Sequence, residues 1–177
     1  MATWVAFLRA INLGATRKFP KDAIVAATEA AGFTGVATHI NTGNVRLETS
    51  MRSRTRIESA LEAAYEADRG FAVPTIAFTV AELREVAATA DQVGAGHDGR
   101  HYVWLLKHEP DAAAVEAFTA LAGGAETVHV EGRAAHLLLP TDYLASRASD
   151  IARVEKLVGP ATNRNVTVVR AVTAKWC

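Results

Sequence analysis

The sequence predicts an α+β fold in which a first subdomain, residues 1–91, packs on a second, smaller one, residues 92–177. Three observations predict it. Short apolar runs alternate with segments of helical periodicity along the whole chain. Hydrophobic residues make up 50% of the 177 positions, which is enough for a substantial core. A stretch rich in glycine and polar residues, 91–100, separates two halves that show the same order of elements.

The first half reads as strand, helix, strand, strand, helix, strand. The apolar run at 3–9 suits a central strand, and Pro20 with Asp22 begins a helix that stops near Gly32. Gly43-Asn44 tolerates the positive φ of a tight hairpin. This order is the ferredoxin-like arrangement, with further strands at 36–41, 45–49 and 73–78 and a helix at 52–69.

The second half repeats the order. Residues 79–82 form a capping box, which begins a helix that runs to about residue 90. Later helices are expected after Asp111 and after Thr141 or Asp142, and strands at 101–107, 127–131 and 134–139. The sequence leaves two alternatives for the secondary structure of the segment 163–176. Its valines favour a strand, whereas Val168 and Val172 with a cap at 162 or 163 favour a helix.

Composition narrows the function classes. Lys plus Arg and Asp plus Glu are both 19, so the formal net charge is zero and general nucleic-acid binding is not expected. The chain has one cysteine, Cys177 at its last position, which excludes an intrachain disulfide and suits a reducing compartment. No apolar stretch reaches transmembrane length. The expected location is therefore the cytoplasm.

Four matches carry a resemblance to a known family. They are F-L-R-A-I-N-L-G at 7–14, Gly32-Phe33 with Val36 before a strand, T-G-N-V at 42–45 and the segment 162–168. Together they resemble the bacterial family called domain of unknown function 1697, over essentially the whole chain. The resemblance implies two α+β subdomains, the first ferredoxin-like, and a helical tail, but it implies no reaction. Ala10 and Ala15 stand where that family usually has glycine, which weakens the expectation of a close backbone approach to a ligand there.

The predicted sheet order gathers polar residues at one edge of the first subdomain. The end of the first strand, the turn between the next two strands and the start of the first helix meet there. This places Arg9, Asn12 and Lys18 beside Thr42 and Asn44. The free N–H groups at the helix start favour an anion, which arginine binds through two parallel hydrogen bonds. The alternative is that these residues only end a strand and form a turn.

Arg164 and Asn165 form a second polar pair, expected near the start of the last helix. They match the tail motif of the resembled family. Two interpretations stay open: the pair folds back to complete the anion site, or it caps the helix and binds the sheet.

The resulting hypothesis is binding of a small anionic ligand, such as a nucleotide or a phosphorylated metabolite. Because none of the candidate residues is an evident general base, binding is favoured over catalysis, and enzymatic activity is left open. No cofactor is expected. No metal is expected either, because His129 and His136 read as exposed cross-strand neighbours without a third ligand. The alternative function is a homodimeric interaction or scaffold protein in which the polar residues are structural.

Overall fold

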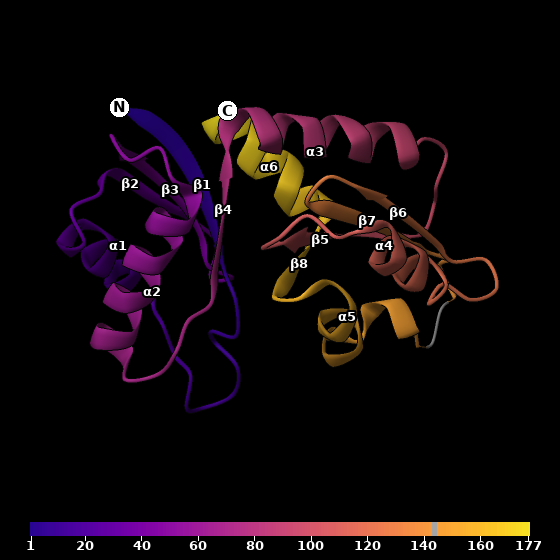
Figure 1. Ribbon diagram of the computed structural model, residues 1–177, viewed down its shortest axis with the longest axis horizontal. Helices are drawn as coiled ribbons and strands as arrows, with labels where there is room; N and C mark the ends of the chain where they lie inside the picture. Colours follow the sequence, from indigo (N-terminus) through magenta and orange to yellow (C-terminus); the bar gives the residue numbers. More distant parts are fainter. Residues whose placement is uncertain (143–144) are drawn as a thin grey trace. The chain divides into compact units, whose positions relative to one another are not determined.

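The computed structural model describes residues 1–142 and 145–177, which form two compact units (Figure 1). The first unit comprises Met1–Leu83 and Ala174–Cys177, and the second Arg84–Thr173. The division falls between Leu83 and Arg84, inside α3 (Val80–Val93), and the predicted boundary between residues 91 and 92 lies near the end of the same helix. Each unit contains one four-stranded antiparallel sheet with interleaved helices, so the α+β class is confirmed.

The sheet of the first unit has the strand order β2-β3-β1-β4, which makes β1 a central strand as predicted. Antiparallel pairing joins β1 to both β3 and β4. Its elements, in chain order, are β1 (Ala2–Leu8), α1 (Lys21–Ala30), β2 (Thr34–His39), β3 (Asn44–Thr49), α2 (Arg54–Arg69) and β4 (Thr75–Thr79).

The core of the first unit lies between one face of this sheet and the two helices. Alternate residues of β1, namely Trp4, Ala6 and Leu8, point into it, as the period of two in a strand requires. Ile24 of α1 and Leu61 of α2 meet them from the helices. This packing fixes the end of β1 beside the start of α1, where the polar loops lie.

The sheet of the second unit has the order β6-β7-β5-β8. Its elements are α3 (Val80–Val93), which begins in the first unit, β5 (Arg100–Leu106), α4 (Ala112–Thr119), β6 (Thr127–Glu131), β7 (Ala134–Leu139), the 3-10 helix η1 (Arg147–Ser149), α5 (Ile151–Val158), β8 (Ala161–Asn165) and α6 (Val166–Trp176). The capping box at the start of α3 is confirmed: Glu82 accepts from the Thr79 N–H at 2.8 Å, and the Thr79 hydroxyl accepts from the Glu82 N–H at 3.1 Å.

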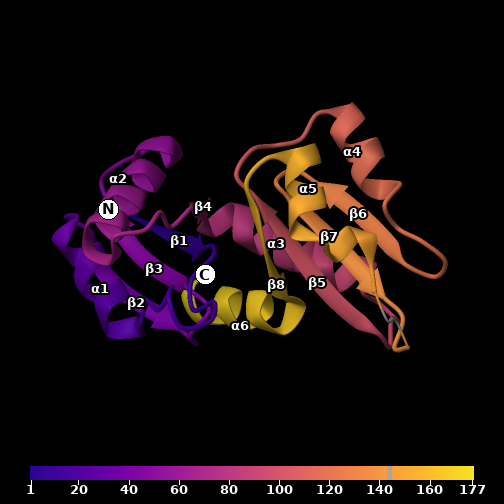
Figure 2. The same ribbon diagram turned by 90° about the horizontal axis from the view of Figure 1, so that it is seen from below.

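Helices cover both faces of the second sheet. The main apolar core lies between the sheet and α4 with α5, where Trp104 and Phe118 stack edge to face at 6.4 Å. α3 and α6 lie on the opposite side of this sheet (Figures 1 and 2). Such a sheet buries both faces, and this explains why β7 carries no exposed residue.

One predicted helix start was wrong. The helix expected after Thr141 or Asp142 begins at Ile151, capped by the Asp150 carboxylate, which accepts from the Arg153 N–H at 3.0 Å. Before this helix, residues 147–149 form η1, and Ala148 is buried there with its carbonyl accepting from the Trp104 indole at 3.0 Å. Leu144, which was assigned to that helix, lies outside the described residues.

The ambiguous tail contains both structures that its sequence allowed. Residues Ala161–Asn165 form β8, and α6 follows directly. The cap is Asn165, whose side-chain oxygen accepts from the Thr167 N–H at 2.9 Å, and not residue 162 or 163. None of the helices in the described part of the chain is long and apolar enough to cross a membrane.

Candidate functional site

The candidate site is built from two loops of the first unit: residues 9–20, between β1 and α1, and residues 40–43, between β2 and β3. Arg9 opens the first loop directly after β1, and its N–H donates to the Pro74 carbonyl at 2.9 Å. Strand pairing therefore continues one residue past β1 and holds the loop's first residue in place.

Asn12 ties the two loops together. Its amide nitrogen donates to the Asn41 carbonyl at 2.6 Å, which crosses from one loop to the other. Its amide oxygen accepts from the Phe19 N–H at 3.0 Å, and its own N–H donates to the Arg17 carbonyl at 2.6 Å. Asn12 was predicted to bind the ligand, but the contacts observed are those of a residue that shapes the site.

Arg17 belongs to the same loop and has a structural role. Its guanidinium donates to the carbonyls of Ala10 and Ala72, both at 2.6 Å, and lies 4.4 Å from the centre of the Phe71 ring. This cation is therefore occupied in closing the loop against the segment before β4.

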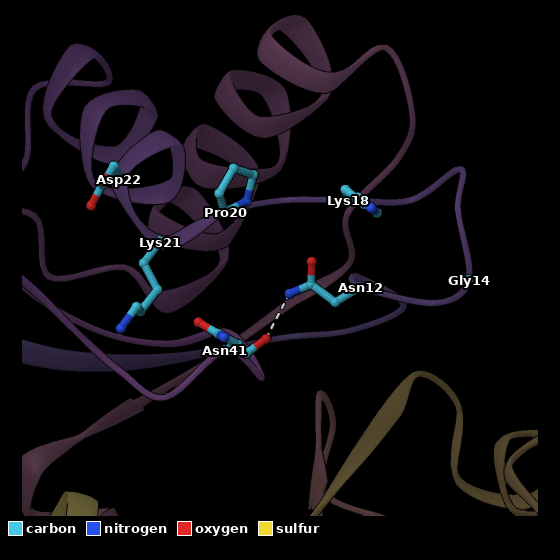
Figure 3. Close-up of a pocket in the computed structure, with 7 residues that line it drawn as sticks. All are labelled: Asn12, Gly14, Lys18, Pro20, Lys21, Asp22 and Asn41. Atoms are coloured by element: carbon cyan, nitrogen blue, oxygen red, sulfur yellow. Dashed lines mark hydrogen bonds between the residues drawn. The ribbon is translucent and has the colours of Figure 1, made fainter.

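A pocket of about 510 Å³ opens where these loops meet the start of α1. Asn12 and Asn41 border it opposite the first turn of the helix (Figure 3). Its volume falls within the range of small-molecule sites. The lining residues are Asn12, Gly14, Lys18, Pro20, Lys21, Asp22 and Asn41.

The start of α1 differs from that of the other α-helices in the described part of the chain. Pro20 occupies its cap position and offers no side-chain hydrogen bond to the first N–H groups. Side chains cap the others: Thr79 for α3, Asn165 for α6, and the serine or aspartate residues Ser53, Asp111 and Asp150 for α2, α4 and α5. The first turn of α1 thus leaves its backbone donors at the pocket for another acceptor.

The charges around the pocket are unequal. Lys18 and Lys21 are exposed cations, and Asp22 is one exposed anion in the first turn. Asp22 interacts favourably with the helix dipole, which offsets part of the positive potential. Two lysines against one aspartate leave an excess of positive charge, and the dipole adds to it.

Backbone strain gathers in the same two loops. Ala10, Asn12 and Ile40 are the described non-glycine residues with positive φ, at 57°, 55° and 50°. This conformation is rare for alanine and rarer still for a β-branched residue such as isoleucine. Residues held in it persist where the surrounding structure fixes them, which is often at binding sites.

The β2–β3 connection is not the tight turn that the sequence indicated. Asn44 is the first residue of β3 and fully buried, and its side-chain amide donates to the His39 carbonyl and the Thr42 hydroxyl, both at 2.9 Å. Gly43, at φ 74°, makes the bend, and the four residues 40–43 form the loop. Asn44 therefore holds the loop from below, and Thr42 lies in the loop itself.

Arg164 and Asn165 lie in the second unit, at the end of β8. Arg164 is buried, and its guanidinium donates to the Thr162 hydroxyl and the Asn163 carbonyl, both at 2.8 Å. Burial lowers the pKa of Arg164 to about 10, which still leaves it charged at neutral pH. Asn165 caps α6. Their part in ligand binding stays a prediction.

The structure thus brings Arg9, Asn12, Lys18 and Thr42 to two neighbouring loops of one unit, with Asn44 at the start of β3 directly after the second loop. Two of these residues, Asn12 and Lys18, line the pocket. Sequence reasoning missed Lys21 and Asn41. The helix start at Pro20 could have identified Lys21, because it places that lysine in the first turn beside the free N–H groups. Nothing in the sequence indicates Asn41, whose contribution is a backbone carbonyl.

The interpretation of the two cross-strand histidines was wrong for His136. It does pair with His129 across β6 and β7, but it is fully buried and hydrogen bonded to His101 at 3.2 Å. The alternation of a strand shows which residues share a face and not what covers that face. Among the described residues, no group of three or more potential ligands is arranged to hold a metal ion.

The chain belongs to the family described as "Protein of unknown function (DUF1697)", whose model matches residues 1–136. The tail motif at 162–168 lies outside that match. In structure the chain is similar to the conserved bacterial protein SP0830 from Streptococcus pneumoniae, with a TM-score of 0.81 and 16% sequence identity over 99% of this chain and 98% of that one. At this identity the likeness concerns the fold. No curated protein matches the chain.

Proposed function

We propose that the protein binds a small anionic ligand, such as a nucleotide or a phosphorylated metabolite, in the pocket at the start of α1. The observation that carries the proposal is the uncapped first turn of α1, which opens on a pocket of about 510 Å³ bordered by two lysines. Backbone N–H groups at a helix start and nearby cations are the usual donors for phosphate.

The residues divide into two roles under this proposal. Lys18, Lys21 and the first backbone N–H groups of α1 contact the anion. Asn12 holds the loops at the geometry that the ligand requires, since its amide is occupied by Asn41 and Phe19. Ala10 and Ile40 are non-glycine residues of these loops with positive φ. Their strained backbone supports a site whose shape is fixed before binding.

The sequence also predicts ligand contacts by five further residues: Arg9, Thr42, Asn44, Arg164 and Asn165. Asn44 is buried beneath its loop, and Asn165 is engaged as a helix cap, so their contacts favour supporting roles. Participation of the arginines rests on the sequence argument alone. Binding without catalysis remains the favoured activity.

Calorimetric titration with inorganic pyrophosphate and with ADP tests the proposal. Lys21→Gln is expected to weaken binding about tenfold, because one charge-assisted contact is lost. Lys156→Gln is the matched control, since it removes an exposed lysine from α5 in the second unit. Equal affinities for both variants, or no binding by the unmodified protein at millimolar ligand, would contradict the proposal.

The alternative, a homodimer joined through a sheet edge, finds less support. β2 is an edge strand of the first sheet, and an edge of this kind can pair with a second copy. However, its register with β3 shifts between Thr34 and Ala37, and Gly35 lies at φ 58° within that stretch. Irregularities of this kind discourage strand addition. Sedimentation equilibrium distinguishes a monomer from a dimer directly.

We also propose that the first unit is a ferredoxin-like subdomain, supported by its β-α-β-β-α-β order and its strand order β2-β3-β1-β4. A cytoplasmic location is proposed from the single cysteine, which suits a reducing compartment.

A further inference from the structure

The second sheet buries two histidines on the face that α3 and α6 cover. His101 comes from β5 and His136 from β7, and their side chains are 6% and 0% exposed. The His101 Nε2 and His136 Nδ1 atoms lie 3.2 Å apart, within hydrogen-bonding distance, and the rings are inclined by 65°. The proposed ligand site uses neither residue.

This pair cannot satisfy all four of its ring nitrogens. One neutral imidazole donates to the other through the 3.2 Å contact, which leaves His101 Nδ1 and His136 Nε2 facing outward. Both outward atoms are buried and have no hydrogen-bond partner in the described part of the chain. In either tautomer one of them is an N–H without an acceptor and the other a bare nitrogen. An added proton would turn both into N–H groups without acceptors.

The cover over the pair is tightly fitted. A Cβ at Gly94, the residue after α3, would lie 3.0 Å from His101 Nδ1, so the chain passes directly against the ring. Asp91 of α3 and Arg170 of α6 form an ion pair at 2.7 Å that joins the two covering helices. The Thr89 hydroxyl of α3 donates to the Glu131 carboxylate of β6 at 3.0 Å.

Charged and titratable groups surround the pair from every covering element. Burial is the largest cause that lowers the pKa of both histidines, to about 4, and Arg170 and His97 lower that of His101 further. His101 and His129 lower the pKa of His136. Asp91 and Glu131 act in the opposite direction. Arg164 of β8 lies on the same face of the sheet as His136, because Val103 of β5 is paired with both residues. Arg164 is a cation and therefore adds no negative charge near the histidines.

We propose that the His101–His136 pair is an acid-sensitive latch, whose protonation releases α3 and α6 from the second sheet. In the closed state both rings are neutral and the Asp91–Arg170 ion pair holds the covering helices together. A proton on the pair places a buried charge near Arg170 and leaves two buried N–H groups without acceptors, and the cover opens to let water solvate them.

The sign of the effect follows from linkage. The opened state exposes the histidines, whose pKa then returns to the ordinary value near 6.5, whereas the closed state holds it at about 4. The opened state therefore binds more protons between these values, and closure weakens as the pH falls through that window. If opening takes up one proton, the equilibrium between the closed and the opened cover shifts toward the opened state by about thirtyfold at pH 5 relative to neutral pH.

Hydrogen exchange of the full chain at pH 7.5 and pH 5.0 tests the latch, with rates corrected for the intrinsic effect of pH. Protection of residues 84–93 and 166–173 is expected to fall about thirtyfold or more at the lower pH. Protection of α2 in the first unit serves as the internal reference. Unchanged protection in those two segments at pH 5.0 would overturn the proposal.

The double variant His101→Phe with His136→Leu removes the titrating pair, and its protection should no longer depend on pH in this window. His129→Gln is the matched control, because His129 lies on the neighbouring strand and is exposed, and the dependence should persist in it. A dependence that survives the double variant contradicts the latch. If the double variant does not fold, NMR of the unmodified protein from pH 7.5 to pH 4 decides: ring carbons of His101 and His136 that titrate together with the loss of amide protection in 84–93 and 166–173 support the latch, and rings that become charged while those segments stay protected overturn it.

Discussion

The two units share one strand permutation and differ in how they end the first strand. The order β2-β3-β1-β4 of the first sheet corresponds strand for strand to β6-β7-β5-β8 of the second. In the first unit residues 9–20 connect β1 to α1, and in the second the much shorter segment 107–111 connects β5 to α4. The long connection creates the pocket, and the short one leads straight into a capped helix.

The equivalent helix starts show the same contrast. Asp111 caps α4, with its carboxylate accepting from the Ala114 N–H at 2.8 Å. α1 begins after Pro20, which supplies no such acceptor. A side-chain carboxylate satisfies the first turn in one unit, whereas in the other those donors are left for a ligand. The comparison teaches that the strand topology is compatible with either arrangement, and that the loop before the helix decides whether its first N–H groups are capped by a side chain or left open.

The hairpin glycines should show the largest difference between the units. At Gly43, with φ 74°, an added Cβ would lie 2.6 Å from the Leu8 Cβ, so Gly43→Ala combines backbone strain with a clash and should cost about 3 kcal/mol. Gly132, with φ 54°, has no atom within 4 Å of an added Cβ, and Gly132→Ala should cost about 1 kcal/mol. Urea denaturation measures both, and equal losses would contradict the tight packing of the first loop.

A second pair of variants separates ligand contacts from structural contacts. Arg164→Ala should lower stability by about 2 kcal/mol, because a buried guanidinium with two hydrogen bonds is removed, and should leave pyrophosphate affinity unchanged. Lys21→Gln should do the reverse, with about tenfold weaker binding and a stability change within about 0.5 kcal/mol. A loss of affinity in Arg164→Ala would restore this arginine to the ligand site.

The first residues of β3 and β7 provide a smaller test. Asn44 begins β3 and holds its loop through two hydrogen bonds, whereas the equivalent Ala134 of β7 has no polar side chain. Asn44→Ala should therefore cost about 1.5 kcal/mol and weaken ligand binding by loosening the loop. A variant as stable as the unmodified protein would show that the loop does not depend on this side chain.

Local signals in the sequence predicted much of this fold. The capping box at Thr79 and Glu82 and the cap at Asp111 were identified correctly, because these interactions lie within one helical turn. Gly43-Asn44 was misjudged, since the turn preference of asparagine also suits a buried residue that bonds a loop from inside the sheet. The α+β class follows from the alternation of strands and helices.

The candidate site was less accessible to sequence reasoning. The family motif and the helix start at Pro20 pointed to the two loops that border the pocket, but the bond from Asn12 to the Asn41 carbonyl depends on how two distant loops meet. His136 was placed on the correct strand but expected to be exposed, because the helices that bury it come from distant parts of the chain. Long-range packing is the information that the local pattern lacks.

The central claim is that the open start of α1 binds an anion while the capped start of α4 does not. An NMR titration of the unmodified protein with inorganic pyrophosphate tests it most directly, because the backbone amides of residues 21–23 and 112–114 can be followed in one experiment. The account predicts saturable shifts at 21–23 that disappear in Lys18→Gln with Lys21→Gln, and no saturable shift at 112–114. Equal shifts at both helix starts, or none at 21–23, would contradict it.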